Sequence, residues 1–138
     1  MAVDAKEKGI MLLGTKTGVD MNAATTKTIL YTVPAGKRAI ITHVIIRDPS
    51  ATLAGCDDAD FGTGAACATE NFLNTEIGIG DMTATTDFMV LTAESDEYTI
   101  IDGDAADAVD REFGIYMDNA ADGNATATID TFGYLFAS

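Results

Sequence analysis

The sequence is poor in several residue types on which catalytic and metal sites depend. Its 138 residues include no tryptophan, one histidine, two cysteines and two prolines. One histidine and two cysteines are too few for a four-ligand zinc site unless carboxylates complete it. The sequence has no serine in the pattern typical of a catalytic nucleophile, so no Ser-His-Asp arrangement can be argued. We therefore expect no enzymatic activity, and we expect the lone His43 to be a packed structural residue.

Basic residues are also scarce. Eight Lys and Arg stand against 22 Asp and Glu, which gives a net charge of −14. Residues 1–55 carry seven of the eight bases and four acids, whereas residues 56–138 carry one base and 18 acids. Binding to nucleic acid needs clustered Lys and Arg, so we expect no direct nucleic-acid partner. Such acidity is typical of a protein from a high-salt source, or of an ordinary acidic protein with solvated loops.

The chain has no apolar run near the ~18 residues that a transmembrane helix needs. Its first 20 residues contain only Ile10–Leu13 as an apolar run and no cleavage pattern, so we expect cytoplasmic synthesis and no membrane partner. Cys56 and Cys67 bracket the segment DDADFGTGAA. This spacing allows a disulfide that closes a short loop, or two free thiols, which are the rule in a cytoplasm.

Strand-forming sequence is abundant, and its densest part is Thr28–Arg47. Thr28–Val33 and Arg38–Ile46 are rich in β-branched and aromatic residues. The intervening Pro-Ala-Gly-Lys predicts a tight turn with Pro34 at its first central position and Gly36 in the left-handed conformation. We therefore expect the two strands to pair as a hairpin. The second strand is apolar on both parities, as is typical of a central strand or of a subunit contact.

Four later segments also have strand character. They are Thr85–Thr92, Tyr98–Ile101, Glu112–Asp118 and Ala125–Phe136. Glu112–Asp118 alternates between apolar and polar residues, which predicts an antiparallel strand with one exposed face. Ala125–Phe136 carries three aromatic residues on one parity. Residues 51–83 are irregular and rich in Gly, Ala and Asp, so we expect long loops with one or two short strands.

About seven to nine strands without helical periodicity predict an all-β fold. We expect a single antiparallel β-sandwich of the jelly-roll type, with an extended N-terminal arm. Residues 1–20 would form this arm or a first edge strand, and residues 21–138 would form the sandwich domain.

One acidic loop has the spacing of a cation site. Its four aspartates are Asp102, Asp104, Asp107 and Asp110. Calcium binds several carboxylate and carbonyl oxygens from one flexible loop, although the order of residues here is not that of an EF-hand. The sequence therefore offers a candidate calcium site, with solvated loop carboxylates as the alternative, and it implies no other cofactor.

The segment Tyr31–Lys37, YTVPAGK, with the apolar strand after it, resembles the opening hairpin of small β-sandwich structural proteins of tailed viruses. The closing segment Thr126–Phe136 is similar to the last strand of such proteins. The resemblance implies a virion protein, with a head decoration (cement) protein as the first choice. It further implies a homotrimer that sits on the capsid lattice in contact with the major capsid protein.

In that role the basic N-terminal arm would contact the shell, with Lys6, Lys8 and Lys16 as candidate capsid-contact residues. Two other functions stay open: a tail, neck or fibre subunit of the virion, and a carbohydrate-binding sandwich for host attachment. Sugar-binding sites present exposed aromatic rings, and without tryptophan this chain relies on its tyrosines for that purpose.

Overall fold

The computed structural model describes residues 9–76, 78–93 and 100–138, and this part of the chain forms nine β-strands and two short 3-10 helices. The strands are Met11–Asp20 (β1), Lys27–Thr32 (β2), Lys37–Arg47 (β3), Asp58–Thr63 (β4), Thr69–Glu76 (β5), Phe88–Thr92 (β6), Ile101–Asp102 (β7), Glu112–Asn119 (β8) and Thr126–Ala137 (β9). The helices are Gly78–Asp81 (η2) and Ala108–Arg111 (η3). The predicted all-β class is confirmed.

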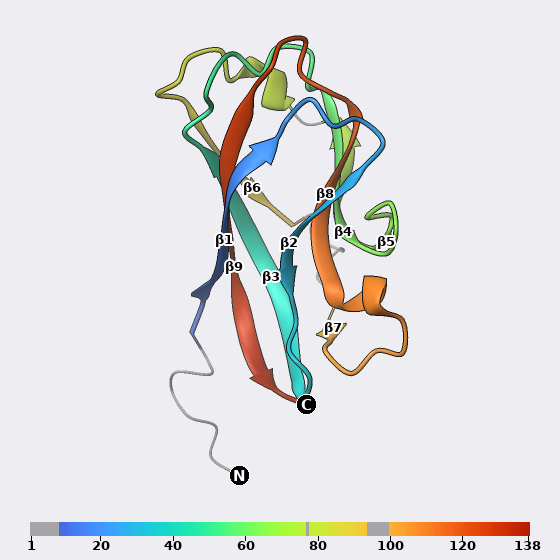
Figure 1. Ribbon diagram of the computed structural model, residues 1–138. Helices are drawn as coiled ribbons and strands as arrows, with labels where there is room; N and C mark the ends of the chain where they lie inside the picture. The colour runs from blue at the N-terminus through green and yellow to red at the C-terminus, as the bar shows by residue number, and fades with distance from the viewer. Residues whose placement is uncertain (1–8, 77, 94–99) are drawn as a thin grey trace.

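The strands form two antiparallel sheets that pack as a sandwich (Figure 1). The five-stranded sheet has the order β1-β9-β3-β6, with β7 also paired to β3, and the four-stranded sheet has the order β2-β8-β4-β5. The first four strands alternate between the two sheets. Among the described residues, no helix is long and apolar enough to cross a membrane.

The predicted hairpin of β2 and β3 is wrong. β2 pairs with β8 in one sheet, whereas β3 pairs with β9 and β6 in the other. The turn between them therefore carries the chain from sheet to sheet. Its hydrogen bond runs from the Lys37 N–H to the Pro34 carbonyl over 3.1 Å, so Pro34 is the first residue of the turn and not a central one. Gly36 does adopt the left-handed conformation, with φ of 74°.

β3 is a central strand, as its two apolar parities predict. Its buried side chains are Ala39, Ile41, Val44 and Ile46. These four do not share one parity, because a bulge between Ile41 and His43 shifts the register against β9. One extra residue in a strand moves every later side chain to the opposite face. Strict alternation along this segment predicts one common face for Ile40, Val44 and Ile46, and that prediction is wrong for this reason.

The later strands agree with the sequence except at their ends. β8 buries Phe113, Ile115 and Met117, as its alternation predicts. The irregular stretch 51–83 contains β4 and β5. β6 begins only at Phe88, because the Asp87 N–H bonds to the Ala84 carbonyl in a turn. Half of the strand predicted at Tyr98–Ile101 lies outside the described residues; of the other half, Ile100 is in no strand and Ile101 lies in β7.

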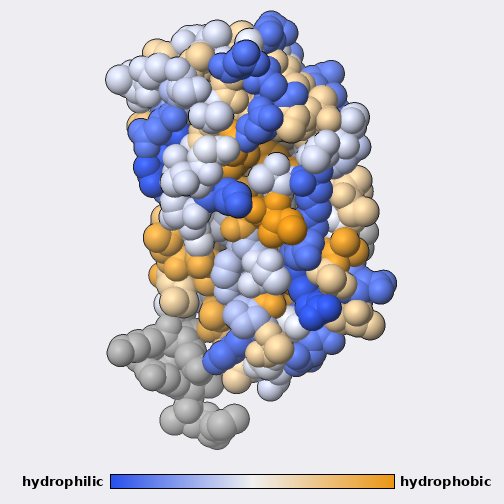
Figure 2. All heavy atoms as spheres, viewed as in Figure 1, coloured by the Kyte–Doolittle hydropathy of each residue, from blue (hydrophilic) through white to orange (hydrophobic). Residues whose placement is uncertain are grey.

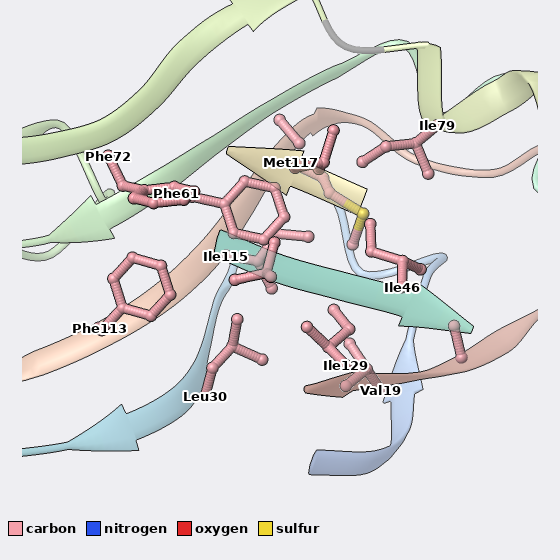
Figure 3. Packing of buried hydrophobic residues seen from close by; sticks show 14 of the residues in the cluster. Val19, Leu30, Ile46, Phe61, Phe72, Ile79, Phe113, Ile115, Met117 and Ile129 are labelled. Carbon is pink, nitrogen blue, oxygen red and sulfur yellow. The ribbon is translucent and has the colours of Figure 1, made fainter. Parts of the chain in front are cut away.

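The core lies between the two sheets (Figure 3). The four-stranded sheet contributes Phe61, Phe72 and Phe113, and the rings of Phe72 and Phe113 meet edge to face at 5.5 Å. The five-stranded sheet contributes Ile46 and Ile129, both fully buried. Each such side chain stabilises the fold by about 1.5–3 kcal/mol when it leaves water.

The N-terminal segment is an edge strand where it is described. β1 pairs with β9 at the edge of the five-stranded sheet, so residues 11–20 belong to the sandwich. Residues 1–8 lie outside the described part. Cys56 and Cys67 are buried thiols and form no disulfide with each other. Burial raises the pKa of both thiols to about 11, so each stays protonated at neutral pH.

Candidate interaction surface

The outer face of the five-stranded sheet carries a group of apolar and aromatic side chains among polar ones. They alternate with core residues along β3, β6 and β9, so they point away from the core. We call this surface the aromatic face. Its residues are Leu12, Ile40, His43, Ile45, Phe88, Val90, Phe132, Tyr134 and Phe136. In Figure 2 apolar side chains are visible at the left margin, beside β1 of Figure 1.

Strand register places these residues in rows across the sheet. Phe132 lies between Leu12 on β1 and His43 on β3. The His43 and Phe132 rings stack with centroids 4.5 Å apart and planes 5° from parallel. The expectation that His43 is a packed residue agrees with this contact. One step along, Ile45 lies opposite Val90 on β6.

The outer strands leave apolar side chains in water. Leu12 is 51 % exposed, Val90 49 % and Phe88 70 %. Apolar side chains gathered on one face in this way, in a chain of net charge −14, are typical of a site that another molecule covers.

Asp130, a carboxylate on this face, is neutralised locally. Asp130 accepts hydrogen bonds from Arg47 Nε at 2.8 Å and from Thr15 Oγ1 at 2.7 Å. The Arg47 hydrogen bond is the main reason that the pKa of Asp130 lies below its ordinary value. This network joins β1, β3 and β9, so it fixes the edge strand to the sheet without adding free negative charge.

The outer face of the four-stranded sheet has the opposite character, and we call it the acidic face. It is formed by Asp58 and Asp60 on β4 with Tyr116 and Asp118 on β8. Burial, together with the neighbouring charges of Asp118 and Asp58, raises the pKa of Asp60. The sandwich therefore has one aromatic and one acidic outer surface.

The acidic loop predicted as a calcium site serves the turn between β2 and β3. Asp104 Oδ1 accepts the Gly36 N–H at 2.9 Å, and Asp102 lies 3.5 Å from Arg38 in an ion pair. Asp107 and Asp110 belong to the start and the body of η3. Throughout the described part of the chain, no three His, Cys, Asp or Glu side chains gather as a metal site would require. The structure thus does not bring the four aspartates together.

The candidate capsid-contact lysines are only partly described. Lys16 is exposed on the edge strand β1, opposite Ile129 of β9. Lys6 and Lys8 lie outside the described residues.

Sequence reasoning missed the role of Lys27. Its ammonium is nearly buried and donates hydrogen bonds to the carbonyls of Gly64 at 2.8 Å and Glu112 at 2.7 Å. A longer contact of 3.4 Å reaches the Val109 carbonyl. Lys27 therefore ties β2 to β8, to η3 and to the loop after β4. Only its place beside an apolar strand in a chain poor in lysine could have indicated a structural role.

The exposed Phe88 and Val90 were also not singled out from the sequence. Phe88-Met89-Val90-Leu91 is a run of four apolar residues, and such a run does not tell which parity meets the core. A hollow of about 370 Å³ borders Phe88. Its other lining residues are Asp81, Met82, Thr86, Asp87 and Met89.

These features define a class: an antiparallel β-sandwich with one aromatic and one acidic outer face. A search of protein-family models and a search of curated proteins find no match to this chain. The two outer faces are therefore the features of the molecule that bear most directly on its function.

Proposed function

We propose that this chain is a structural protein that assembles with copies of itself and with a larger protein shell, as a capsid decoration protein of a tailed virus does. The observation that carries the proposal is the aromatic face, an exposed apolar surface on a strongly acidic molecule. The resemblance of Tyr31–Lys37 and Thr126–Phe136 to virion sandwich proteins points to the same class.

The order of the strands supports a sandwich of the jelly-roll type. Such folds place eight strands in two four-stranded sheets, with the first strand beside the last. Here β1 lies beside β9 in the order β1-β9-β3-β6, and the facing sheet has the order β2-β8-β4-β5. The short β7 is an addition at the side of β3.

The proposed mechanism is adhesion without a chemical step. Apolar side chains on the aromatic face leave water when a partner covers them, and each square ångström buried contributes roughly 25 cal/mol. The acidic face stays hydrated and keeps the assembled particle soluble. Basic residues near the N-terminus, with Lys16 as the described member, supply the contact to an acidic shell surface.

The test uses expanded capsid shells that lack the protein. Binding of the protein should raise the temperature at which the shells disrupt. Replacement of Lys6, Lys8 and Lys16 by alanine should abolish this gain, whereas Lys37→Ala, a basic residue at the turn before β3, should keep it. Shells with the same disruption temperature with and without the wild-type protein would reject the decoration role.

One observation favours a second candidate, carbohydrate binding. Phe88 is 70 % exposed beside a hollow that Asp81 and Asp87 line. An exposed ring for stacking next to carboxylates for hydrogen bonds suits a sugar. Binding to a glycan array that Phe88→Ala abolishes would support this function over shell binding. Unchanged glycan binding by Phe88→Ala would show that the sugar does not bind at the hollow beside Phe88.

A further inference from the structure

We infer that two copies of this chain pack face to face through their aromatic faces, as a twofold-symmetric pair. The inference deepens the proposed function, because it assigns the surface by which copies associate. It differs from the homotrimer that the resemblance implies. Only the biological role of the pair rests on the proposed function, because the pair itself forms in solution without a shell.

The apolar side chains favour a partner of the same kind. Leu12 on β1 and Val90 on β6 lie on opposite edges of the sheet, and both are about half exposed. The stacked rings of His43 and Phe132 lie between these edges. A symmetric contact places the same patch of both copies together, so apolar side chains of one copy meet apolar side chains of the other.

The charge distribution favours this face over the acidic face for contact between copies. Strand register places Arg38 and Arg47 on the aromatic face, against Asp20, Asp102 and Asp130, a net charge of −1. Both arginines are ion-paired there, Arg38 with Asp102 and Arg47 with Asp130. The whole chain has a net charge of −14, so the rest of the molecule carries −13. Contact through the aromatic face therefore brings less like charge together than contact through the acidic face.

Face-to-face packing also separates the acidic faces. Packed sheets lie ~10 Å apart, so the two acidic faces of a four-sheet stack would be about 30 Å apart. The Debye length at physiological ionic strength is about 8 Å, so repulsion across the pair is largely screened.

The area is sufficient for a stable pair. Four strands at a spacing of ~4.8 Å give a width of about 19 Å. The β3–β9 ladder of ten residue pairs, at ~3.3 Å per residue, gives a length of about 33 Å. Each copy then contributes ~600 Å² and the pair buries ~1,200 Å², the lower end of the range for specific interfaces.

The experiment measures molar mass by light scattering and sedimentation on the purified full chain. The wild type should have about twice the mass of the 14.4 kDa monomer at micromolar concentration. Val90→Glu, in the aromatic face, should raise the dissociation constant ~100-fold or more, because it places an unpaired charge in an apolar contact. Val109→Glu is the matched control, since Val109 is 38 % exposed on η3, away from that face, and its mass should not change.

Three results would overturn the inference. They are a wild-type protein that is still monomeric at 100 times the micromolar concentration, a wild-type trimer, and equal masses for the Val90→Glu and Val109→Glu variants. If Val90→Glu fails to fold by circular dichroism, Leu12→Glu at the other edge decides in its place. Added NaCl should leave the pair intact, because salt screens ionic contacts and not apolar ones. Dissociation by salt would indicate instead that the aromatic face of one copy pairs with the acidic face of another, and would also overturn the inference. The shell assay fails independently: a pair that binds no shell keeps this inference and rejects the decoration role.

Discussion

Replacement of Lys27 by methionine should destabilise the sandwich far more than replacement of an exposed lysine. Lys27 lies on β2 at the edge of the four-stranded sheet, and its side chain is 9 % exposed. Its ammonium donates to the carbonyls of Gly64 and Glu112 at 2.8 and 2.7 Å. Methionine keeps most of the apolar stem, so the change removes the three N–H donors and little packing.

The magnitude follows from those two short hydrogen bonds. A hydrogen bond with a charged donor contributes about 1.5–3 kcal/mol, and two of them about 3–6 kcal/mol. The variant also avoids the free-energy cost of burying a charged ammonium, which offsets part of this loss. The free energy of unfolding should therefore fall by about 2–4 kcal/mol. For a domain of this size the melting temperature should fall by about 10 °C.

The assay is thermal and urea unfolding followed by circular dichroism, with Lys16→Met as the control. Lys16 is exposed on β1, so its replacement should change the free energy of unfolding by less than about 0.5 kcal/mol. Equal stability of the two variants would refute the structural role of the Lys27 ammonium.

Three further predictions concern titration, thiol reactivity and calcium. Arg47 lowers the pKa of Asp130 below its ordinary value of 3.8, so their contact stabilises the fold above that pH and is lost as the pH falls through the lowered value. Asp130→Asn should therefore flatten the acid side of a profile of melting temperature against pH, taken from about pH 2 to 5. A variant with the same profile as the wild type would contradict this. With thiol pKa values near 11, Cys56 and Cys67 should resist iodoacetamide at neutral pH in the folded protein and react in urea, so fast labelling of the native protein would show that they are not buried. Two carboxylates of the loop 102–110 already bind the preceding turn or Arg38, so calcium and chelator should give the same melting temperature, and a higher value with calcium would restore the cation site.

Local patterns predicted strands well where one face is buried along the whole strand. The alternation in β8 correctly assigned Phe113, Ile115 and Met117 to a single face, because the pleat has a period of two and no bulge interrupts it. The two apolar parities of β3 correctly predicted a central strand. Its faces were not predictable, since the bulge before His43 depends on the register with β9.

The connection of β2 to β3 shows what local sequence cannot decide. A hairpin and a crossing between sheets both need a tight turn, and Pro34–Lys37 with a left-handed Gly36 suits either. The choice depends on pairings with β8 and β9, which lie some 80 to 100 residues later in the chain. The aromatic face was accessible only in part, because Phe132, Tyr134 and Phe136 were seen on one parity but its continuation onto β6 requires the sheet order.

The association of copies through the aromatic face can be tested by side-chain footprinting with a carbene reagent, at protein concentrations below and above the onset of association. Leu12, Phe88 and Val90 should lose label as the copies associate, while the exposed Ile29 and Val109 should label equally at both concentrations. Constant labelling of the first three side chains, or protection of Ile29 and Val109 instead, would contradict this expectation.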